Sequence, residues 1–173
     1  LLASSAASDV YKRQYISNAK SFPEKWQEKA INFRNERAFF SNLELDIPYG
    51  PSDREKMDIF YPKEGAKGVF VFIHGGYWRA FDKSTWSHLS LGALDNGFVS
   101  VIPSYRLCPE VSIAQITLDI AKCIIAIAKR VNSGPIVLAG HSAGGHLVSR
   151  MLCGNLLPKN VSNRLRCVCL LYT

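Results

Sequence analysis

The segment 140–144, Gly-His-Ser-Ala-Gly, has the residue types and spacing that can turn a serine into a nucleophile. An apolar, partly β-branched run at residues 135–139 precedes it and predicts a buried parallel strand. A chain that leaves such a strand and enters a helix must reverse so tightly that the central serine holds a strained backbone. Gly140 and Gly144 leave room for this reversal, and Ser142 then stands at the positive end of the following helix.

A glycine-rich turn between a strand and a helix also occurs in nucleotide-binding folds, where a serine serves only as a helix cap. A dinucleotide-binding loop needs the pattern G-x-G-x-x-G, and a P-loop needs a lysine directly before its serine or threonine. Neither pattern surrounds residues 140–145. The turn therefore favours a nucleophile, and a capping serine stays as the alternative.

A second motif, His-Gly-Gly-Tyr-Trp at residues 74–78, follows another predicted buried strand at residues 68–73. Acyl transfer to a serine requires N–H groups that stabilise the oxyanion of the tetrahedral intermediate. One donor is the amide after the nucleophile, here Ala143, and the others come from a loop after an earlier strand, where glycines let the backbone approach the substrate. The alternative is a Gly-Gly turn with aromatic packing behind it.

Four stretches make the chain similar to the α/β-hydrolase superfamily, and in particular to its kynurenine formamidase-like (arylformamidase-like) esterases. They are Met-Asp-Ile-Phe-Tyr-Pro at 57–62, His-Gly-Gly-Tyr-Trp-Arg at 74–79, Tyr-Arg-Leu-Cys-Pro-Glu-Val-Ser at 105–112 and Gly-His-Ser-Ala-Gly-Gly-His-Leu at 140–147. The resemblance covers roughly residues 15–166. Hormone-sensitive-lipase-type carboxylesterases share Tyr-Arg-Leu-x-Pro-Glu but carry a third glycine at the position of Tyr77, so they are the second family considered.

The resemblance implies an α/β-hydrolase fold: a mostly parallel twisted sheet with helices on both faces, preceded by an N-terminal helix and a β-hairpin. It implies that Ser142 attacks an N-formyl arylamide or a small carboxylic ester and forms an acyl-enzyme. It assigns the oxyanion hole to the amides of Gly76, Tyr77 and Ala143. It places the other motif residues at the turn, the loop or the pocket wall: His74, Gly75, Trp78, Gly140, His141 and Gly144. It implies no cofactor.

The triad of this fold orders serine, then Asp or Glu, then His. Beyond Ser142 the sequence has no Asp or Glu, and its only His is His146, which we expect on the helix surface or in packing. We therefore expect residues 15–173 to form a partial hydrolase domain that lacks its last strands and is inactive alone. A non-catalytic hydrolase-like binding domain is the alternative. His88 is expected to be structural.

Residues 1–14 match no element of this family, and together with residues 169–173 they resemble translated adaptor sequence. The alternative is a disordered Ser/Ala-rich tail and a genuine strand. Residues 1–14 are therefore left out of the fold prediction.

Composition narrows the function classes. Much of the net charge of +7 lies in residues 12–37, where glutamates interrupt the basic residues, so a solvated helix face is favoured over a nucleic-acid site. The five irregularly spaced cysteines favour free thiols and a cytoplasmic setting, with Cys108, Cys123 and Cys153 as small buried residues. No metal site and no membrane span is expected. The expected partner is a small-molecule substrate; the oligomeric state is open, and a homodimer is one option.

Apolar periodicity predicts the elements that position these motifs. Helical spacing predicts helices after Pro23, around residues 85–95 and across residues 113–131. Alternation and apolar runs predict strands at residues 43–47, 56–61, 68–73, 98–103, 135–139 and 166–171. Strands that alternate with helices predict a mostly parallel sheet with right-handed crossovers.

Overall fold

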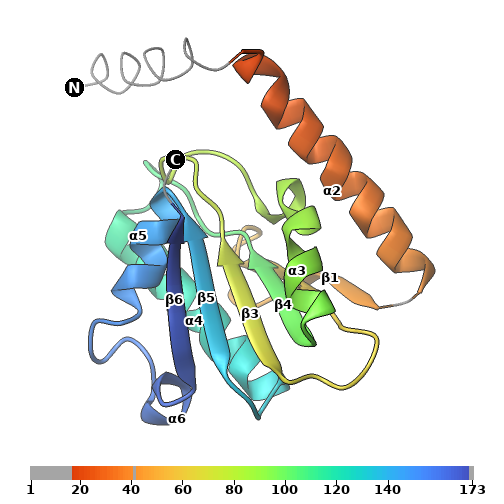
Figure 1. Ribbon diagram of the computed structural model, residues 1–173. Helices are drawn as coiled ribbons and strands as arrows, with labels where there is room; N and C mark the ends of the chain where they lie inside the picture. Colours follow the sequence, from red (N-terminus) through yellow and green to blue (C-terminus); the bar gives the residue numbers. More distant parts are fainter. Residues whose placement is uncertain (1–16, 41, 172–173) are drawn as a thin grey trace.

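A twisted sheet with helices on both faces organises the chain in the computed structural model, which describes residues 17–40 and 42–171 (Figure 1). Its strands are β1 (Leu43–Pro48), β2 (Lys56–Phe60), β3 (Gly68–Ile73), β4 (Phe98–Pro103), β5 (Ile136–His141) and β6 (Leu165–Leu171). Their order across the sheet is β1-β2-β4-β3-β5-β6. Strands β4, β3, β5 and β6 are parallel, whereas β1 and β2 form an antiparallel hairpin.

Each predicted strand is therefore present, with ends that differ by no more than a few residues. The central strands β3 and β5 are apolar and largely buried, as strands covered on both faces must be. In a parallel sheet the carboxyl ends of neighbouring strands meet at one edge. The loop after β3 and the turn after β5 consequently lie at the same end of the sheet (Figure 1).

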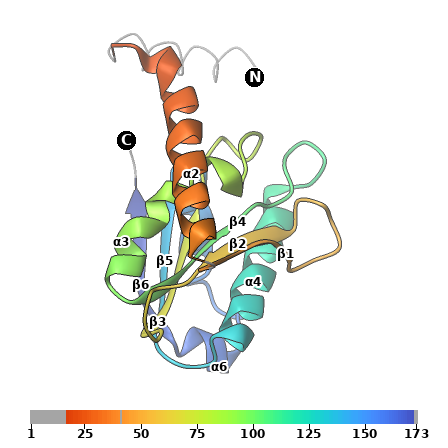
Figure 2. The same ribbon diagram turned by 90° about the vertical axis from the view of Figure 1, so that its right-hand side faces the viewer.

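The helices form two layers (Figure 2). On one face, α4 (Ile113–Arg130), α5 (Ala143–Arg150) and α6 (Lys159–Ser162) close a core that includes Ile120, Leu147 and Val161. On the other face, α2 (Phe22–Phe39) and α3 (Leu91–Asp95) cover a smaller cluster. Helix α2 follows the short 3₁₀ helix η1 (Ala19–Ser21), and its buried residues are Ala30 and Phe33.

The helix expected around residues 85–95 is wrong in its first half. Two 3₁₀ helices, η2 (Lys83–Thr85) and η3 (Ser87–Ser90), stand there, and only α3 is α-helical. The carboxylate of Asp82 accepts a hydrogen bond from the amide of Ser84, which favours a tight turn over a continuous helix. The predicted end is confirmed, because Gly97 adopts a positive φ of 80° and donates its N–H to the carbonyl of Leu94.

The environments of the cysteines differ from the expectation at two positions. Cys123 is buried in α4 as predicted, but Cys108 is half-buried and Cys153 is exposed. Cys153 lies in the turn after α5, on the surface, where a thiol meets water. Strand β6 forms one border of the sheet among the described residues, and Leu170 is 58% exposed there. No helix in the described part of the chain is long and apolar enough to cross a membrane.

Candidate active site

Ser142 occupies the turn between β5 and α5, in a backbone conformation that residues other than glycine rarely adopt. Its φ is 53° and its ψ is −116°. The amide of Ser142 donates to the carbonyl of Leu171 at 2.9 Å, and the carbonyl of Ser142 accepts from the amide of His146 at 3.2 Å. The side chain is exposed at the end of the sheet. A strained serine held by its neighbours is the local geometry that the sequence predicted.

Two glycines make this turn sterically possible. A Cβ atom at Gly140 would lie 2.2 Å from the carbonyl oxygen of Gly144, and one at Gly144 would lie 2.0 Å from the carbonyl oxygen of Ile73. The atoms that would clash belong to the backbone, so no side-chain rotation relieves them. At Gly145 the nearest atom to such a Cβ is 3.3 Å away, so this third glycine is far less constrained.

The loop after β3 touches the serine turn. A Cβ atom at Gly75 would lie 3.1 Å from the Cβ of Ser142 and 2.8 Å from the carbonyl oxygen of His141. Three consecutive residues then take positive φ angles: Gly76 at 109°, Tyr77 at 55° and Trp78 at 57°. The structure thus brings together the two motifs that the sequence predicted to cooperate, although they lie far apart in the chain.

His74 is fully buried below this loop, and its ring stacks on Tyr105 with the ring centroids 4.4 Å apart. Its Nδ1 lies 2.7 Å from the carbonyl oxygen of Gly75, so we assign the proton to Nδ1. Burial lowers the pKa of His74 to about 4, so the ring is neutral near pH 7. The resemblance implied that His74 belongs to this loop motif; its burial and its stacking on Tyr105 were not predicted.

The depressed pKa of His74 predicts a loss of stability in acid. Above its ordinary pKa of 6.5 the ring is neutral in both folded and unfolded chains. Between that value and about 4, the unfolded chain binds a proton that the folded chain does not, so unfolding becomes easier as the pH falls. The expected loss is about 3 kcal/mol. Urea unfolding at several pH values checks it against His74→Asn, which keeps a side-chain N–H donor. Parallel pH profiles of the two proteins would contradict it.

His146 contacts Trp78 of the loop after β3. It is exposed on α5, and its ring meets Trp78 edge-to-face at a centroid distance of 5.5 Å. Tyr77, the residue before Trp78, is 50% exposed. His146 was expected on the helix surface or in packing; it is exposed and also contacts Trp78, a partner that was not foreseen. His88 and His141 are half-buried, and burial lowers the pKa of each.

An aromatic cluster joins α2 to the loop. Trp86 lies 5.1 Å from Trp26 of α2, 5.7 Å from Phe81 of the loop and 6.4 Å from His141 beside the serine, measured between ring centroids. The motif analysis missed Phe81 and Trp86. Their only sequence signal is that they are aromatic residues shortly after the glycine loop.

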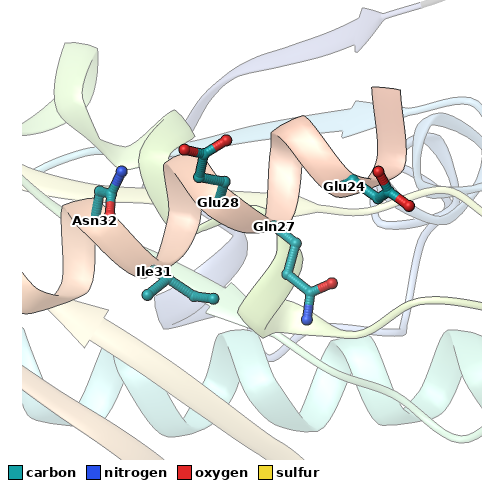
Figure 3. A pocket seen from close by; sticks show the side chains of 5 residues that line it. All are labelled: Glu24, Gln27, Glu28, Ile31 and Asn32. Atoms are coloured by element: carbon teal, nitrogen blue, oxygen red, sulfur yellow. The ribbon is translucent and has the colours of Figure 1, made fainter. Parts of the chain in front are cut away.

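The hollow shown in Figure 3 lies on α2 and is not part of the candidate site around Ser142. It is shallow, has a volume of about 280 Å³, and is lined by five residues of α2: Glu24, Gln27, Glu28, Ile31 and Asn32. None of them belongs to the motifs around Ser142. Among the residues that the structure describes, no group of three His, Cys, Asp or Glu side chains could hold a metal ion.

The architecture and the solved structures that resemble it define an α/β-hydrolase fold. A crystal structure from Silicibacter sp. TM1040, described as a candidate thioesterase, superposes with a TM-score of 0.86 at 51% identity, over 89% of this chain and 58% of that chain. Esterase B from Lactobacillus rhamnosis superposes with a TM-score of 0.59 at 22% identity, over 75% of this chain and 48% of that one, and supports the fold alone.

The profile of the BD-FAE family matches residues 57–163, and the chain belongs to this family. Kynurenine formamidase from Danio rerio is 27% identical over 126 residues, which are 70% of this chain and 43% of the relative. Isoprenylcysteine alpha-carbonyl methylesterase from Arabidopsis thaliana is 28% identical over 119 residues, 64% of this chain and 28% of the relative. The chain thus spans less than half the length of the curated relatives it matches.

Proposed function

We propose that this chain carries the nucleophile and the oxyanion hole of a serine hydrolase that cleaves N-formyl arylamides or small carboxylic esters through an acyl-enzyme. The observation that carries the proposal is the strained backbone of Ser142, with a φ of 53°, against a loop that contains Gly75 and Gly76. The names of the relatives support the substrate class, since they include formamidases and a methylesterase.

In the proposed reaction, Oγ of Ser142 attacks the carbonyl carbon, and the carbonyl oxygen becomes an oxyanion. The amides of Gly76, Tyr77 and Ala143 donate hydrogen bonds to that oxyanion. The proton of Oγ passes to a general base outside this sequence, which gives it to the leaving group as the C–N or C–O bond breaks and the carbonyl re-forms. Water releases the acyl or formyl group and regenerates the serine. Tyr77 and Trp78 flank the substrate.

The proposal leaves the general base and its orienting carboxylate to residues outside this sequence, because no Asp or Glu follows Ser142 and His146 packs on Trp78. A serine without a base is a weak nucleophile, so the 173-residue chain alone is expected to turn over substrate poorly. In the same proposal, residues 15–173 form part of a hydrolase domain and residues 1–14 do not belong to it. The five free cysteines support a cytoplasmic setting.

A hydrolase-like binding domain without turnover is the second candidate. A carboxylesterase of the hormone-sensitive-lipase type is less well supported, because Tyr77 stands where those enzymes carry a glycine.

Labelling with a fluorophosphonate probe tests the proposal in the longest reading frame that contains this sequence. We expect one covalent adduct, which peptide mapping places on Ser142. N-formylkynurenine, p-nitrophenyl acetate and an acyl thioester then distinguish formamidase, esterase and thioesterase activity by their kcat/KM values. A folded protein that forms no adduct and cleaves none of the three would contradict the hydrolase and favour the binding domain.

A further inference from the structure

We propose that Tyr105 and Arg54 are positioning residues, which orient the Gly75–Gly76 peptide so that the N–H of Gly76 serves the oxyanion hole. This inference rests on the proposed function. Both residues lie outside the two motifs around Ser142, and Arg54 comes from the turn between β1 and β2.

The hydroxyl of Tyr105 is the first contact. Tyr105 is fully buried just after β4, and its Oη donates to the carbonyl oxygen of His74 at 2.8 Å. The same Oη lies 3.4 Å from the carbonyl oxygen of Gly75. That oxygen also accepts from Nδ1 of His74, whose ring is stacked on the ring of Tyr105. Because the single hydroxyl proton serves the 2.8 Å bond to His74, Tyr105 acts on the carbonyl of Gly75 chiefly through His74, whose backbone it holds and whose ring it stacks on.

A fixed carbonyl fixes the amide that follows it. The Gly75–Gly76 peptide is trans, so its C=O and N–H point in opposite directions. Since the carbonyl of Gly75 points towards Tyr105, the N–H of Gly76 points away from it. Gly75 itself lies against the serine turn, since a Cβ there would be 3.1 Å from the Cβ of Ser142. The next carbonyl, of Gly76, accepts from the amides of Arg79 and Ala80, which fixes the N–H of Tyr77 in the same way.

Arg54 restrains two backbone segments, one at Tyr105 and one at Phe81. Its Nε donates to the carbonyl oxygen of Tyr105 at 2.8 Å, and its Nη2 donates to the carbonyl oxygen of Phe81 at 2.6 Å. One guanidinium thus joins the backbone of Tyr105 to the far end of the glycine loop. Glycine peptides rotate easily, so a loop that relies on Gly75 and Gly76 needs such restraints from outside.

Tyr105→Phe and Arg54→Ala test the proposal in the longest reading frame. Tyr105→Phe keeps the ring stack and removes the hydroxyl, so we expect kcat for p-nitrophenyl acetate to fall about 10-fold to 100-fold with KM nearly unchanged. For Arg54→Ala we expect about a 10-fold fall in kcat, partly restored by millimolar guanidinium ions. Arg166→Ala is the matched control, since its guanidinium also donates to backbone carbonyls, of Asn163 and Leu165, and we expect it to keep wild-type kcat.

A crystal structure of Tyr105→Phe supplies a readout that does not depend on turnover. We expect the Gly75–Gly76 peptide to be rotated or to occupy two orientations. An unchanged peptide would overturn the proposal whether or not the protein is a hydrolase, as would losses of kcat that simply follow the melting temperature. Failure of the wild-type protein to react with any substrate would instead refute the proposed function, and the peptide orientation would still decide the role of Tyr105.

Discussion

Replacing Ser142 by alanine is expected to lower kcat/KM for the best substrate by at least about 10⁴-fold in the longest reading frame. The reason is that alanine removes the oxygen proposed to attack, while the proposed oxyanion donors and the side chains of Tyr77 and Trp78 remain. The residual rate then reflects binding and oxyanion stabilisation alone. Fluorophosphonate labelling is expected to disappear with the activity, because both need the same Oγ. Steady-state kinetics and intact-protein mass spectrometry measure the two effects.

Ser149→Ala is the matched control for this prediction. Ser149 lies on the same helix α5, and its hydroxyl donates to the nearby carbonyl oxygen of His146, at 2.8 Å. The control is expected to keep wild-type rates and labelling. More than about a tenth of wild-type activity in Ser142→Ala would mean that another residue is the nucleophile, and the strained turn would then need a different explanation.

Gly144→Ala has the second large expected effect, on folding. The added Cβ would lie 2.0 Å from the carbonyl oxygen of Ile73 and 2.7 Å from that of His74, both backbone atoms. To relieve the clash, β3 and the start of α5 must move apart. We expect a loss of more than about 4 kcal/mol, which is large for one substitution and comparable with the whole stability of many domains. Expression yield and chemical unfolding measure the loss.

Gly145→Ala tests whether the effect is specific. Its Cβ would meet the carbonyl oxygen of Gly140 at 3.3 Å, a contact that a small shift relieves. Alanine also favours the helix over glycine by about 1 kcal/mol. The two contributions are expected to offset each other, leaving the stability nearly unchanged. Equal destabilisation by Gly144→Ala and Gly145→Ala would show that helix packing, and not the close approach at Gly144, explains the glycines.

Most of the fold could be predicted from local patterns, because strands and long helices leave a regular apolar spacing in the sequence. The ends of β3 and β4 follow from their apolar runs, and α4 ends at Arg130, one residue before the predicted end at residue 131. The first half of the helix expected at residues 85–95 was mispredicted, and side-chain hydrogen bonds of Asp82 favour the 3₁₀ turn with which this segment begins. Apolar periodicity does not report such bonds.

The candidate site could be predicted only where its residues form contiguous motifs. The serine turn and the glycine loop are contiguous, and the structure places them in contact. Tyr105, just after β4, contacts His74, which is 31 residues away along the chain. Arg54, in the turn between β1 and β2, contacts Phe81, which is 27 residues away. Contacts over such separations depend on the sheet order, which no local pattern specifies.

The hydrogen bond from the amide of Ser142 to the carbonyl of Leu171 has a consequence for the order of folding. Strand β6 follows α5 and α6 in the chain and pairs with β5, the strand that leads into the serine turn. The turn at Ser142 therefore gains this backbone hydrogen bond only when β6 has paired with β5. Ser142 should therefore reach its final backbone conformation only after the chain beyond α5 has joined the sheet.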